Sequence, residues 1–533
     1  MKDQNEVLIC SISEIFSFLK GYDDDKPLRR ILLILKRQNK EGIIIKITEN
    51  YPDSEIDSEM KRLGFSEQIE ATRLDFYNAD CEKASDYLGY IILRPKSPDG
   101  KVGQRVGDTA IEIPKDKGKF QCFLTCKAKI LGDEGKIIDT YPFFQQHWSN
   151  RWECGFATIR MFSKWLRYTT GTPIDVGEEY KDLTFPQIDD LLSRTDPSVF
   201  TVGDFKEVLR KMGLTLLKYE YSNPKDIPTI PPEQIIYSYI ESGIPVFVVF
   251  GTEDEKTEGV RHVVTVIGHT FNPDSWWPEA EKDYYSKVFK TKYLRSIAWI
   301  DFIIHDDNYG PFLTMPKDFL RIDFGIYQTP WYIEHLPSKQ KSKSQEEWVT
   351  KIENLRIREV IVPFRKDVKI TVEEAEQIAF KAITKTEIWN PPKKYDKYYK
   401  ESTLEWKETF FRHFKNENIV LRTFLIRTSD LPNTFPEKRR EEIRRIFSPE
   451  EMSPLLWFVE ISIPELFAHE RCRLGEIIVD PIHSIESMDT EEACLKVIKY
   501  MHLPGAQCWS KNGVKWERAL LRDDEPYSHL IHK

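Results

Sequence analysis

Residues 141–166 read YPFFQQHWSNRWECGFATIRMFSKWL, and the interpretation of the whole chain depends on this stretch. The range 154–167 contains no proline, and its apolar residues recur at four-residue spacing, which predicts a helix with one buried face. Arg160 and Lys164 fall on the opposite face of this helix. The stretch before it is polar and bulky, as in a loop, so Cys154 is expected to be the first residue of the helix.

The position of Cys154 favours a reactive thiol. At the start of a helix the unpaired backbone N–H groups and the helix dipole stabilise a thiolate, which is the form of cysteine that attacks carbonyl carbons. A glutamine upstream, either Gln145 or Gln146, can direct its side-chain amide to the same place, and we take Gln146 as the candidate. Together with the backbone N–H of Cys154, this amide would form an oxyanion hole.

His262 is the candidate general base for this thiol. It begins the run HVVTVIGH at 262–269, whose β-branched residues predict a strand, and another strand, IPVFVVF at 244–250, precedes it. In thiol enzymes the base is often distant from the nucleophile in sequence and near it in space. We therefore expect the helix that carries Cys154 to pack on an antiparallel sheet that carries His262.

A third predicted strand, 298–304, is followed by HDDNYGPF, which places two carboxylates at a strand end. Side chains alternate along a strand, so His305 and Asp307 are expected on one face and Asp306 on the other. We take Asp306 as the residue that accepts the Nδ1 proton of His262 and leaves Nε2 to face the thiol, with Asp307 as its rival. His305 is a weaker candidate base because it would need a partner of its own.

These segments resemble the papain-like superfamily of cysteine peptidases, in particular the C39-like bacterial enzymes. The similar features are a glutamine before CGFATIRMF, the run GIPVFVVFG leading to RHVVTVIGH, and the run IIHDDNYGPF. The resemblance covers about residues 141–315. It implies an α+β catalytic domain in which a nucleophile helix packs on an antiparallel sheet, with Cys154, His262 and Asp306 as the triad. It does not imply a substrate.

The function expected from these residues is hydrolysis of a peptide or isopeptide bond through an acyl-enzyme intermediate, with a protein or peptide as the substrate. Two alternatives stay open: a transglutaminase-like or deamidating thiol enzyme, and a catalytically silent papain-like scaffold that binds a partner. Hydrolysis and acyl transfer share one intermediate, so the sequence does not separate them. The glycine after Cys154 and the presence of His262 favour an enzyme over a silent scaffold.

The composition predicts an ordinary soluble protein that does not bind nucleic acid. The 533 residues are 40% hydrophobic and 31% charged, with a formal net charge of −9, whereas a phosphate backbone is bound by an excess of Lys and Arg. Neither a signal peptide nor a membrane-spanning run is recognised, so we expect a cytoplasmic location without membrane binding. The eight cysteines fit reduced thiols. Cys122 and Cys126 lack a second ligand pair, so neither a metal site nor a cofactor is expected.

Three regions are expected along the chain. They are a small α/β domain at 1–80, a β module with the papain-like catalytic domain at 81–338, and an α+β C-terminal domain at 348–533. The polar, charged run KQKSKSQEE at 339–347 predicts a linker that ends the catalytic domain. Between the nucleophile and the base, two further helices are predicted at 184–193 and 201–212.

Overall fold

The computed structural model divides the chain into two compact units, each assembled from segments that are distant in sequence. The first unit consists of Met1–Ser222, Pro245–Thr270 and Asp301–Pro363, and the second of Asn223–Ile244, Phe271–Ile300 and Phe364–Lys533. The residues that the structure describes are 4–9, 26–38, 43–53, 55–56, 58, 70–78, 83–95, 104–113, 120–129, 137–145, 154–193, 200–222, 230–251, 261–270, 294–295, 301–320, 355–384, 393–447, 452–470, 472–482, 491–510 and 515–528. The predicted linker at 339–347 lies outside them.

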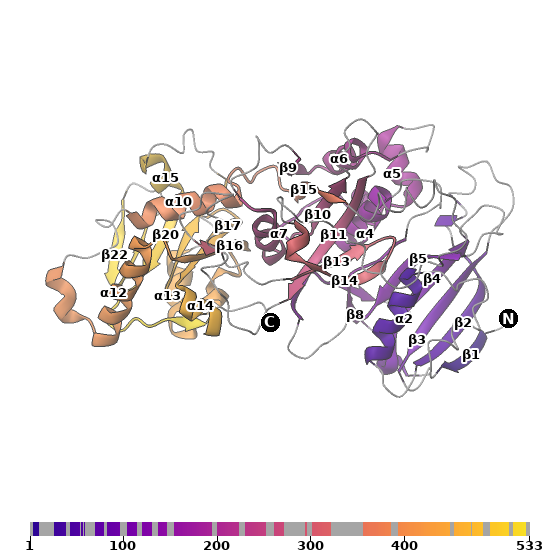
Figure 1. The fold of residues 1–533 in the computed structure, drawn as a ribbon, viewed down its shortest axis with the longest axis horizontal. Coiled ribbons are helices and arrows are strands. Elements are labelled where there is room, and N and C mark those ends of the chain that lie inside the picture. Colours follow the sequence, from indigo (N-terminus) through magenta and orange to yellow (C-terminus); the bar gives the residue numbers. More distant parts are fainter. Residues whose placement is uncertain are drawn as a thin grey trace. The chain divides into compact units, whose positions relative to one another are not determined.

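An antiparallel five-stranded sheet with one helix begins the first unit (Figure 1). Its elements are β1 (Gln4–Ile9), α2 (Lys26–Gln38), β2 (Ile43–Tyr51), β3 (Ala71–Tyr77), β4 (Tyr87–Pro95) and β5 (Gln104–Ile111). In β2 the buried residues Ile43, Ile45 and Ile47 alternate with half-buried polar or apolar neighbours, as expected for a sheet with one covered face. The domain boundary expected at residue 80 falls between β3 and β4, which are paired neighbours in this one sheet.

A second, seven-stranded sheet completes the first unit and carries the candidate site. Its strands run in the order β14-β13-β11-β10-β15-β9, with β6 also paired to β11. They are β6 (Phe120–Phe123), β9 (Thr215–Glu220), β10 (Val246–Gly251), β11 (Arg261–Thr270), β13 (Asp301–Asp306), β14 (Gly310–Pro316) and β15 (Arg356–Phe364); β7 (Cys126–Lys129) and β8 (Ile137–Thr140) form a separate hairpin. Strand β15 follows the predicted linker and pairs antiparallel with β10, so this sheet also contains residues beyond the linker.

Three predicted helices of the first unit are confirmed. They are α4 (Cys154–Tyr168), α5 (Phe185–Leu192) and α6 (Val202–Lys211). Thr184 and Thr201 each form a capping box, in which the threonine side chain accepts from the backbone N–H three residues later. Helix α4 packs against the sheet that contains β10 and β11 (Figure 1). At this contact the rings of Phe162 and Phe247 meet edge to face with centroids 5.5 Å apart.

The charged face of α4 is buried, which the sequence did not predict. Arg160 is 4% exposed and bonds Glu55 at 3.1 Å, while Lys164 is 6% exposed and bonds Asp108 at 2.5 Å. Both acidic partners belong to the N-terminal part of the chain, and they satisfy charges that would otherwise be too costly to bury. Helix α4 is therefore enclosed on two sides, by the seven-stranded sheet and by residues of the N-terminal region.

The second unit is built around a seven-stranded sheet in the order β12-β16-β17-β19-β20-β21-β22. Its strands are β12 (Leu294–Arg295), β16 (Val420–Arg427), β17 (Leu455–Ser462), β19 (Gly475–Val479), β20 (Ile498–Leu503), β21 (Ala506–Trp509) and β22 (Glu517–Leu520). The main helices are α7 (Pro232–Glu241), α10 (Val372–Thr384), α12 (Glu401–Lys415), α13 (Glu437–Ile446), α14 (Pro464–Glu470) and α15 (Glu491–Val497). Two short strands, β18 (Cys472–Arg473) and β23 (Tyr527–Ser528), pair with each other.

The run EEACLKVIKY at 491–500 divides between a helix and a strand. The helix ends at Val497, and Ile498 begins β20, which pairs with β19 and β21. Apart from the parallel pair β12 and β16, the strand pairs of this sheet with a described register are antiparallel. Helices combined with largely antiparallel sheets confirm the α+β class. Within the described part of the chain, no helix has both the length and the apolar content needed to cross a membrane.

Candidate active site

Cys154 is the first residue of α4, as predicted, and its side chain is partly exposed. The first turn of the helix contains no acidic residue that would oppose a thiolate. The next residue, Gly155, lies so close to Phe200 that a Cβ added there would stand 2.5 Å from the ring. Glycine after the cysteine therefore allows Phe200 to pack against the start of the helix.

His262 lies on β11 and connects Cys154 to Asp306. Its Nε2 atom lies 3.0 Å from Oδ2 of Asp306, and its side chain also forms a hydrogen bond with Cys154. The residue is only 6% exposed. Burial alone would lower the pKa of His262, but its contacts with Asp306 and Cys154 raise that pKa well above its usual value. The thiol, the imidazole and the carboxylate, which come from three different elements, thus form one connected group.

The nitrogen that faces Asp306 is not the one expected. We expected Nδ1 of His262 to face the acid and Nε2 to face the thiol, whereas Nε2 faces the acid. The expectation followed the Ser-His-Asp pattern, in which Nδ1 of the histidine donates to the acid. Here Nε2 of His262 is the nitrogen that reaches Asp306 at the end of β13.

Asp306 is held by the turn that follows it. Its Oδ1 accepts the backbone N–H of Asn308 at 2.9 Å, while Oδ2 faces His262. The turn leads into Gly310, whose φ of +122° is in the region that favours glycine. A Cβ at this glycine would also stand 2.8 Å from the Cβ of Arg30 on α2. Asp306 is fully buried, so this turn aims a carboxylate at the imidazole in a site that is shielded from water.

Arg30 is a supporting residue that the sequence did not identify. Its Nε donates to the carbonyl oxygen of Pro311 at 3.3 Å and its Nη2 to that of Phe312, so α2 holds the first residues of β14. Burial lowers the pKa of Arg30 to about 10. No motif in 26–38 signals this role, because its target is a backbone segment about 280 residues away.

Asp307 also belongs to the group, contrary to the expected alternation. One carboxylate oxygen of Asp307 lies within 4.8 Å of ligand-type atoms of both His262 and Asp306, and Asp307 is fully buried. Strand β13 ends at Asp306, and its pairing with β14 shifts register between Ile304 and Asp306. Alternation therefore stops at the turn, and both aspartates approach the imidazole.

His305, the weaker candidate base, lies in a different environment. Its ring meets Tyr141, Phe143 and Phe312 edge to face, with centroid separations of 5.2, 5.6 and 4.8 Å. Burial lowers the pKa of His305 to about 3, so this imidazole stays neutral at ordinary pH. His305 is a core residue that supports the strand carrying Asp306.

The two upstream glutamines are not equally informative. Gln146, the predicted oxyanion residue, lies outside the described residues. Gln145 is tied to β5: its backbone N–H donates to the Val106 carbonyl at 3.0 Å, and its Oε1 accepts the Val106 N–H at 2.9 Å. Gln145 thus joins the candidate segment to the first sheet. Gln146 remains the predicted source of the oxyanion amide.

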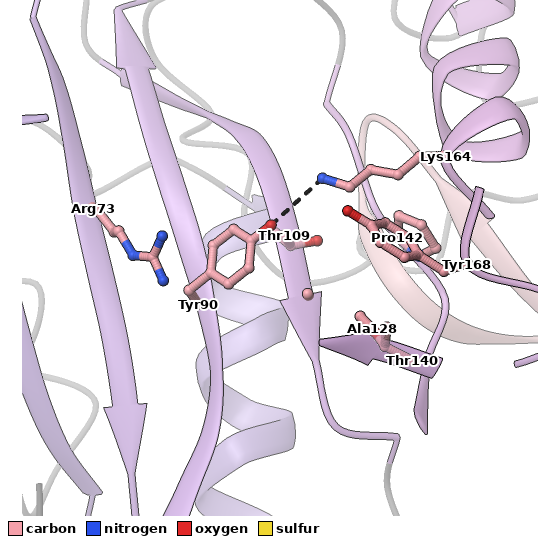
Figure 2. Close-up of a pocket in the computed structure, with 9 residues that line it drawn as sticks. Arg73, Tyr90, Thr109, Ala128, Thr140, Pro142, Lys164 and Tyr168 are labelled. Atoms are coloured by element: carbon pink, nitrogen blue, oxygen red, sulfur yellow. Dashed lines mark hydrogen bonds between the residues drawn. The ribbon is translucent and has the colours of Figure 1, made fainter. Parts of the chain in front are cut away.

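A separate polar cavity of about 180 Å³ lies toward the other end of α4 (Figure 2). Lys164 and Tyr168 line it from α4, and Arg73 and Tyr90 line it from β3 and β4. The Lys164 ammonium bonds the Tyr90 hydroxyl at 3.5 Å, and the Arg73 guanidinium lies over the Tyr90 ring. Both cations also bond buried aspartates, Lys164 to Asp108 and Arg73 to Asp75, so their charges are balanced within the fold.

Comparison with known proteins identifies no relative of this chain. No known protein family has a model that matches the chain, and no curated protein matches it in sequence.

Proposed function

We propose that the protein is a thiol hydrolase that cleaves a peptide or isopeptide bond, with a papain-like catalytic unit. The observation that carries the proposal is the chain of contacts from Cys154 through His262 to Asp306, contributed by α4, β11 and β13. This order along the sequence and these element types are those of the papain-like superfamily, which the sequence also resembles. The fully buried Asp306 supports a role in orientation, since it is aimed at the ring by its own turn.

The reaction follows from the arrangement of the three groups. With Nε2 of His262 facing Asp306, Nδ1 is the nitrogen left to take the thiol proton. The thiolate of Cys154 then attacks the carbonyl carbon, forming a C–S bond, and the imidazolium returns its proton to the leaving amine as the C–N bond breaks. Water, deprotonated by His262, cleaves the resulting thioester. The backbone N–H of Cys154, together with the side-chain amide of Gln146, would stabilise the oxyanion.

An alternative acyl acceptor changes the product and not the first step. If an amine replaces water, the same thioester yields an isopeptide, as in a transglutaminase-like enzyme; if the substrate is a glutamine side chain, water yields a glutamate. Hydrolysis is preferred to cross-linking because it needs only water in addition to the groups on α4, β11 and β13. Peptide cleavage is preferred to deamidation because the papain-like enzymes that the sequence resembles are peptidases. Mass spectrometry of a peptide mixture separates the three outcomes, since cleavage, cross-linking and deamidation change mass differently.

The decisive experiment is cysteine-resolved labelling of the full-length protein with iodoacetamide at about neutral pH. Cys154 should react faster than Cys126, Cys472, Cys494 and Cys508, all of which are buried. Burial also raises the pKa of Cys126 to about 12, so its thiolate is scarce. The Cys154→Ser variant should lose peptide cleavage, whereas Cys126→Ser serves as the matched control. An unreactive Cys154 beside a reactive Cys126 or Cys508 would overturn the assignment.

A further inference from the structure

The polar cavity of about 180 Å³ beside α4 takes no part in the proposed hydrolysis (Figure 2). It lies among β3, β4, β5, the β7–β8 hairpin and α4, which all belong to the first unit. Lys164, which lines it, follows Cys154 by ten residues, or about 15 Å along the helix axis. Arg73, Tyr90 and Tyr168 are half-buried, and the other described lining residues are buried. The cavity is therefore a site separate from the thiol.

The charges that face this cavity are positive. Among the described residues that line it, the charged ones are the cations Arg73 and Lys164, and none is acidic. Their carboxylate partners, Asp75 and Asp108, hold the two cations in place but are not among the lining residues. The Tyr90 ring lies between the cations, with the guanidinium 4.4 Å from its centroid and the ammonium 3.5 Å from its hydroxyl oxygen (Figure 2). A ligand therefore meets the positive ends of two fixed ion pairs.

Each of the two cations keeps an N–H group that no described residue accepts. An ammonium has three such groups, and Lys164 directs two of them to Asp108 and Tyr90. A guanidinium has five, and Arg73 directs four of them to one carboxylate and two tyrosine hydroxyls, those of Asp75, Tyr51 and Tyr87. One N–H group of each cation is thus left for a ligand.

Two hydroxyl groups in the lining also have a proton to donate. The Thr140 oxygen accepts the backbone N–H of Ile111 at 3.2 Å, and its own O–H has no acceptor among the described residues. The Tyr168 hydroxyl likewise has no hydrogen-bond partner in the part of the chain that the structure describes. Thr109, by contrast, uses its hydroxyl on the backbone of Phe143, donating at 3.0 Å and accepting at 3.1 Å. The unused groups of the cavity are thus donors, which suits a ligand with acceptor oxygens.

The remaining lining residues limit the size and shape of the ligand. Ala110, Ala128 and Pro142 add a small apolar wall. A water molecule occupies about 30 Å³ in the liquid, so this cavity has room for about six waters, or for one organic molecule with a similar number of non-hydrogen atoms. An inorganic phosphate would leave the apolar wall uncovered. A carboxylate with a short hydrocarbon chain matches both the donors and the wall.

We propose that this cavity binds a small organic monocarboxylate. The carboxylate oxygens accept from the Lys164 ammonium and from the hydroxyls of Thr140 and Tyr168, and the hydrocarbon part lies against Ala110 and Ala128. Hydrogen bonds from a cation to a carboxylate are about twice as strong as those between neutral groups. The bound molecule links α4 to the β7–β8 hairpin without a covalent bond. The site does not depend on the proposed hydrolysis.

The test titrates the full-length protein with sodium acetate and sodium butyrate by calorimetry, with sodium chloride of equal ionic strength as the blank. One butyrate per chain should bind, more tightly than acetate because its chain covers the apolar wall, and the thermal unfolding midpoint should rise with butyrate concentration. Butyramide, which has the same shape without the charge, should bind at least about tenfold more weakly. Saturable binding of neither carboxylate, or equal binding of butyramide, would overturn the proposal. Phosphate that binds more tightly than butyrate would overturn the choice of an organic carboxylate.

Tyr168→Phe is the variant that places butyrate in the cavity. It removes one donor to the ligand and no hydrogen bond to a described residue, so butyrate affinity should fall by about threefold or more in a protein of unchanged stability. Tyr180→Phe is the matched control, because Tyr180 is also half-buried, in η2 (Glu178–Tyr180), and is not among the lining residues. Lys164→Gln should weaken binding by at least about tenfold, and it also costs stability because Asp108 loses its cation. Equal butyrate affinity in Tyr168→Phe and Tyr180→Phe would mean that butyrate binds elsewhere and that the proposed site is wrong.

Discussion

The Asp306 carboxylate contacts His262 through one oxygen and closes its own turn through the other. Oδ2 lies 3.0 Å from Nε2 of His262, and Oδ1 accepts the backbone N–H of Asn308 at 2.9 Å. The orientation of the imidazole therefore depends on the backbone of the β13–β14 turn. Arg30 and Gly310 hold the far side of this turn, so helix α2 near the N-terminus contributes to the site indirectly.

The first prediction concerns the acid of the triad. In Asp306→Asn the ring of His262 loses the carboxylate that fixes its tautomer, so cleavage should fall by about a hundredfold or more. Labelling of Cys154 should slow as well, and Asp301→Asn should leave both rates unchanged. The opposite pattern, with Asp307→Asn slow and Asp306→Asn normal, would move the role to Asp307. Normal rates in both would mean that this turn supplies no third member.

The second prediction separates the two histidines. His305 lies among three aromatic rings, and its pKa, lowered to about 3, keeps it neutral, so phenylalanine should replace it with little effect on catalysis. His305→Phe should label at Cys154 within about twofold of the unaltered protein, whereas His262→Gln should label slowly. Slow labelling of a folded His305→Phe variant would contradict the assignment of the base.

The third prediction concerns the attachment of α4 to the N-terminal region. Glu55 bonds Arg94 at 3.0 Å and Arg160 at 3.1 Å, and all three are buried. Although burial alone would raise the pKa of Glu55, the two guanidinium groups lower it well below its usual value. Glu55→Gln should destabilise the protein by about 3–5 kcal/mol, because two buried cations lose their shared partner.

Urea unfolding, followed by labelling of Cys154, measures the loss of stability in Glu55→Gln. Glu178→Gln is the matched control, because Glu178 bonds Lys181 in an exposed position and its loss should leave the unfolding midpoint unchanged. A Glu55→Gln midpoint equal to that of the control would mean that this cluster does not hold α4 in place.

The fourth prediction is a pH dependence of the second unit. His502 is fully buried, with Nδ1 3.1 Å from Glu476 and Nε2 2.8 Å from Asp524, while Arg439 lies beside it. Burial alone would lower the pKa of His502, but Asp524 and Glu476 raise it. A raised pKa in the folded state means that the stabilisation is fully present below about pH 6.5 and is lost as the pH rises above that value.

Glu476 responds in the opposite direction. Burial alone would raise its pKa, but His502 and Arg473 lower it to about 2, so its contribution is present above about pH 4.3 and is lost as the pH falls toward 2. The difference in urea midpoint between the unaltered protein and His502→Gln should thus be largest at about pH 5 to 6, where both groups contribute. It should shrink as the pH rises toward about 9 and the stabilisation from His502 is lost. Asp523→Asn is the control, because Asp523 forms an exposed ion pair with Lys400. Its difference in urea midpoint should not change between about pH 6 and 9, since carboxylates titrate below that range. A His502→Gln difference that stays constant over this range would contradict the prediction.

Local patterns in the amino-acid sequence were enough to predict the secondary structure near the candidate site and the order of its groups along the chain. The apolar spacing of 154–167 and the threonine caps at Thr184 and Thr201 identify helices because helix formation depends on residues within a few positions of each other. The β-branched runs that contain β10 and β11 identify strands for the same reason. These local signals were sufficient to place Cys154 at a helix start and His262 on a strand.

The contacts between distant segments could not be predicted from these local patterns. The burial of Arg160 depends on Glu55, the entry of β15 into the sheet depends on β10, and the support of the turn depends on Arg30. Strand pairing and buried ion pairs join residues more than one hundred positions apart, and no local pattern encodes such a partner. The approach of Asp307 to His262 likewise arises where β13 ends and alternation stops, which depends on the register with β14 and not on β13 alone.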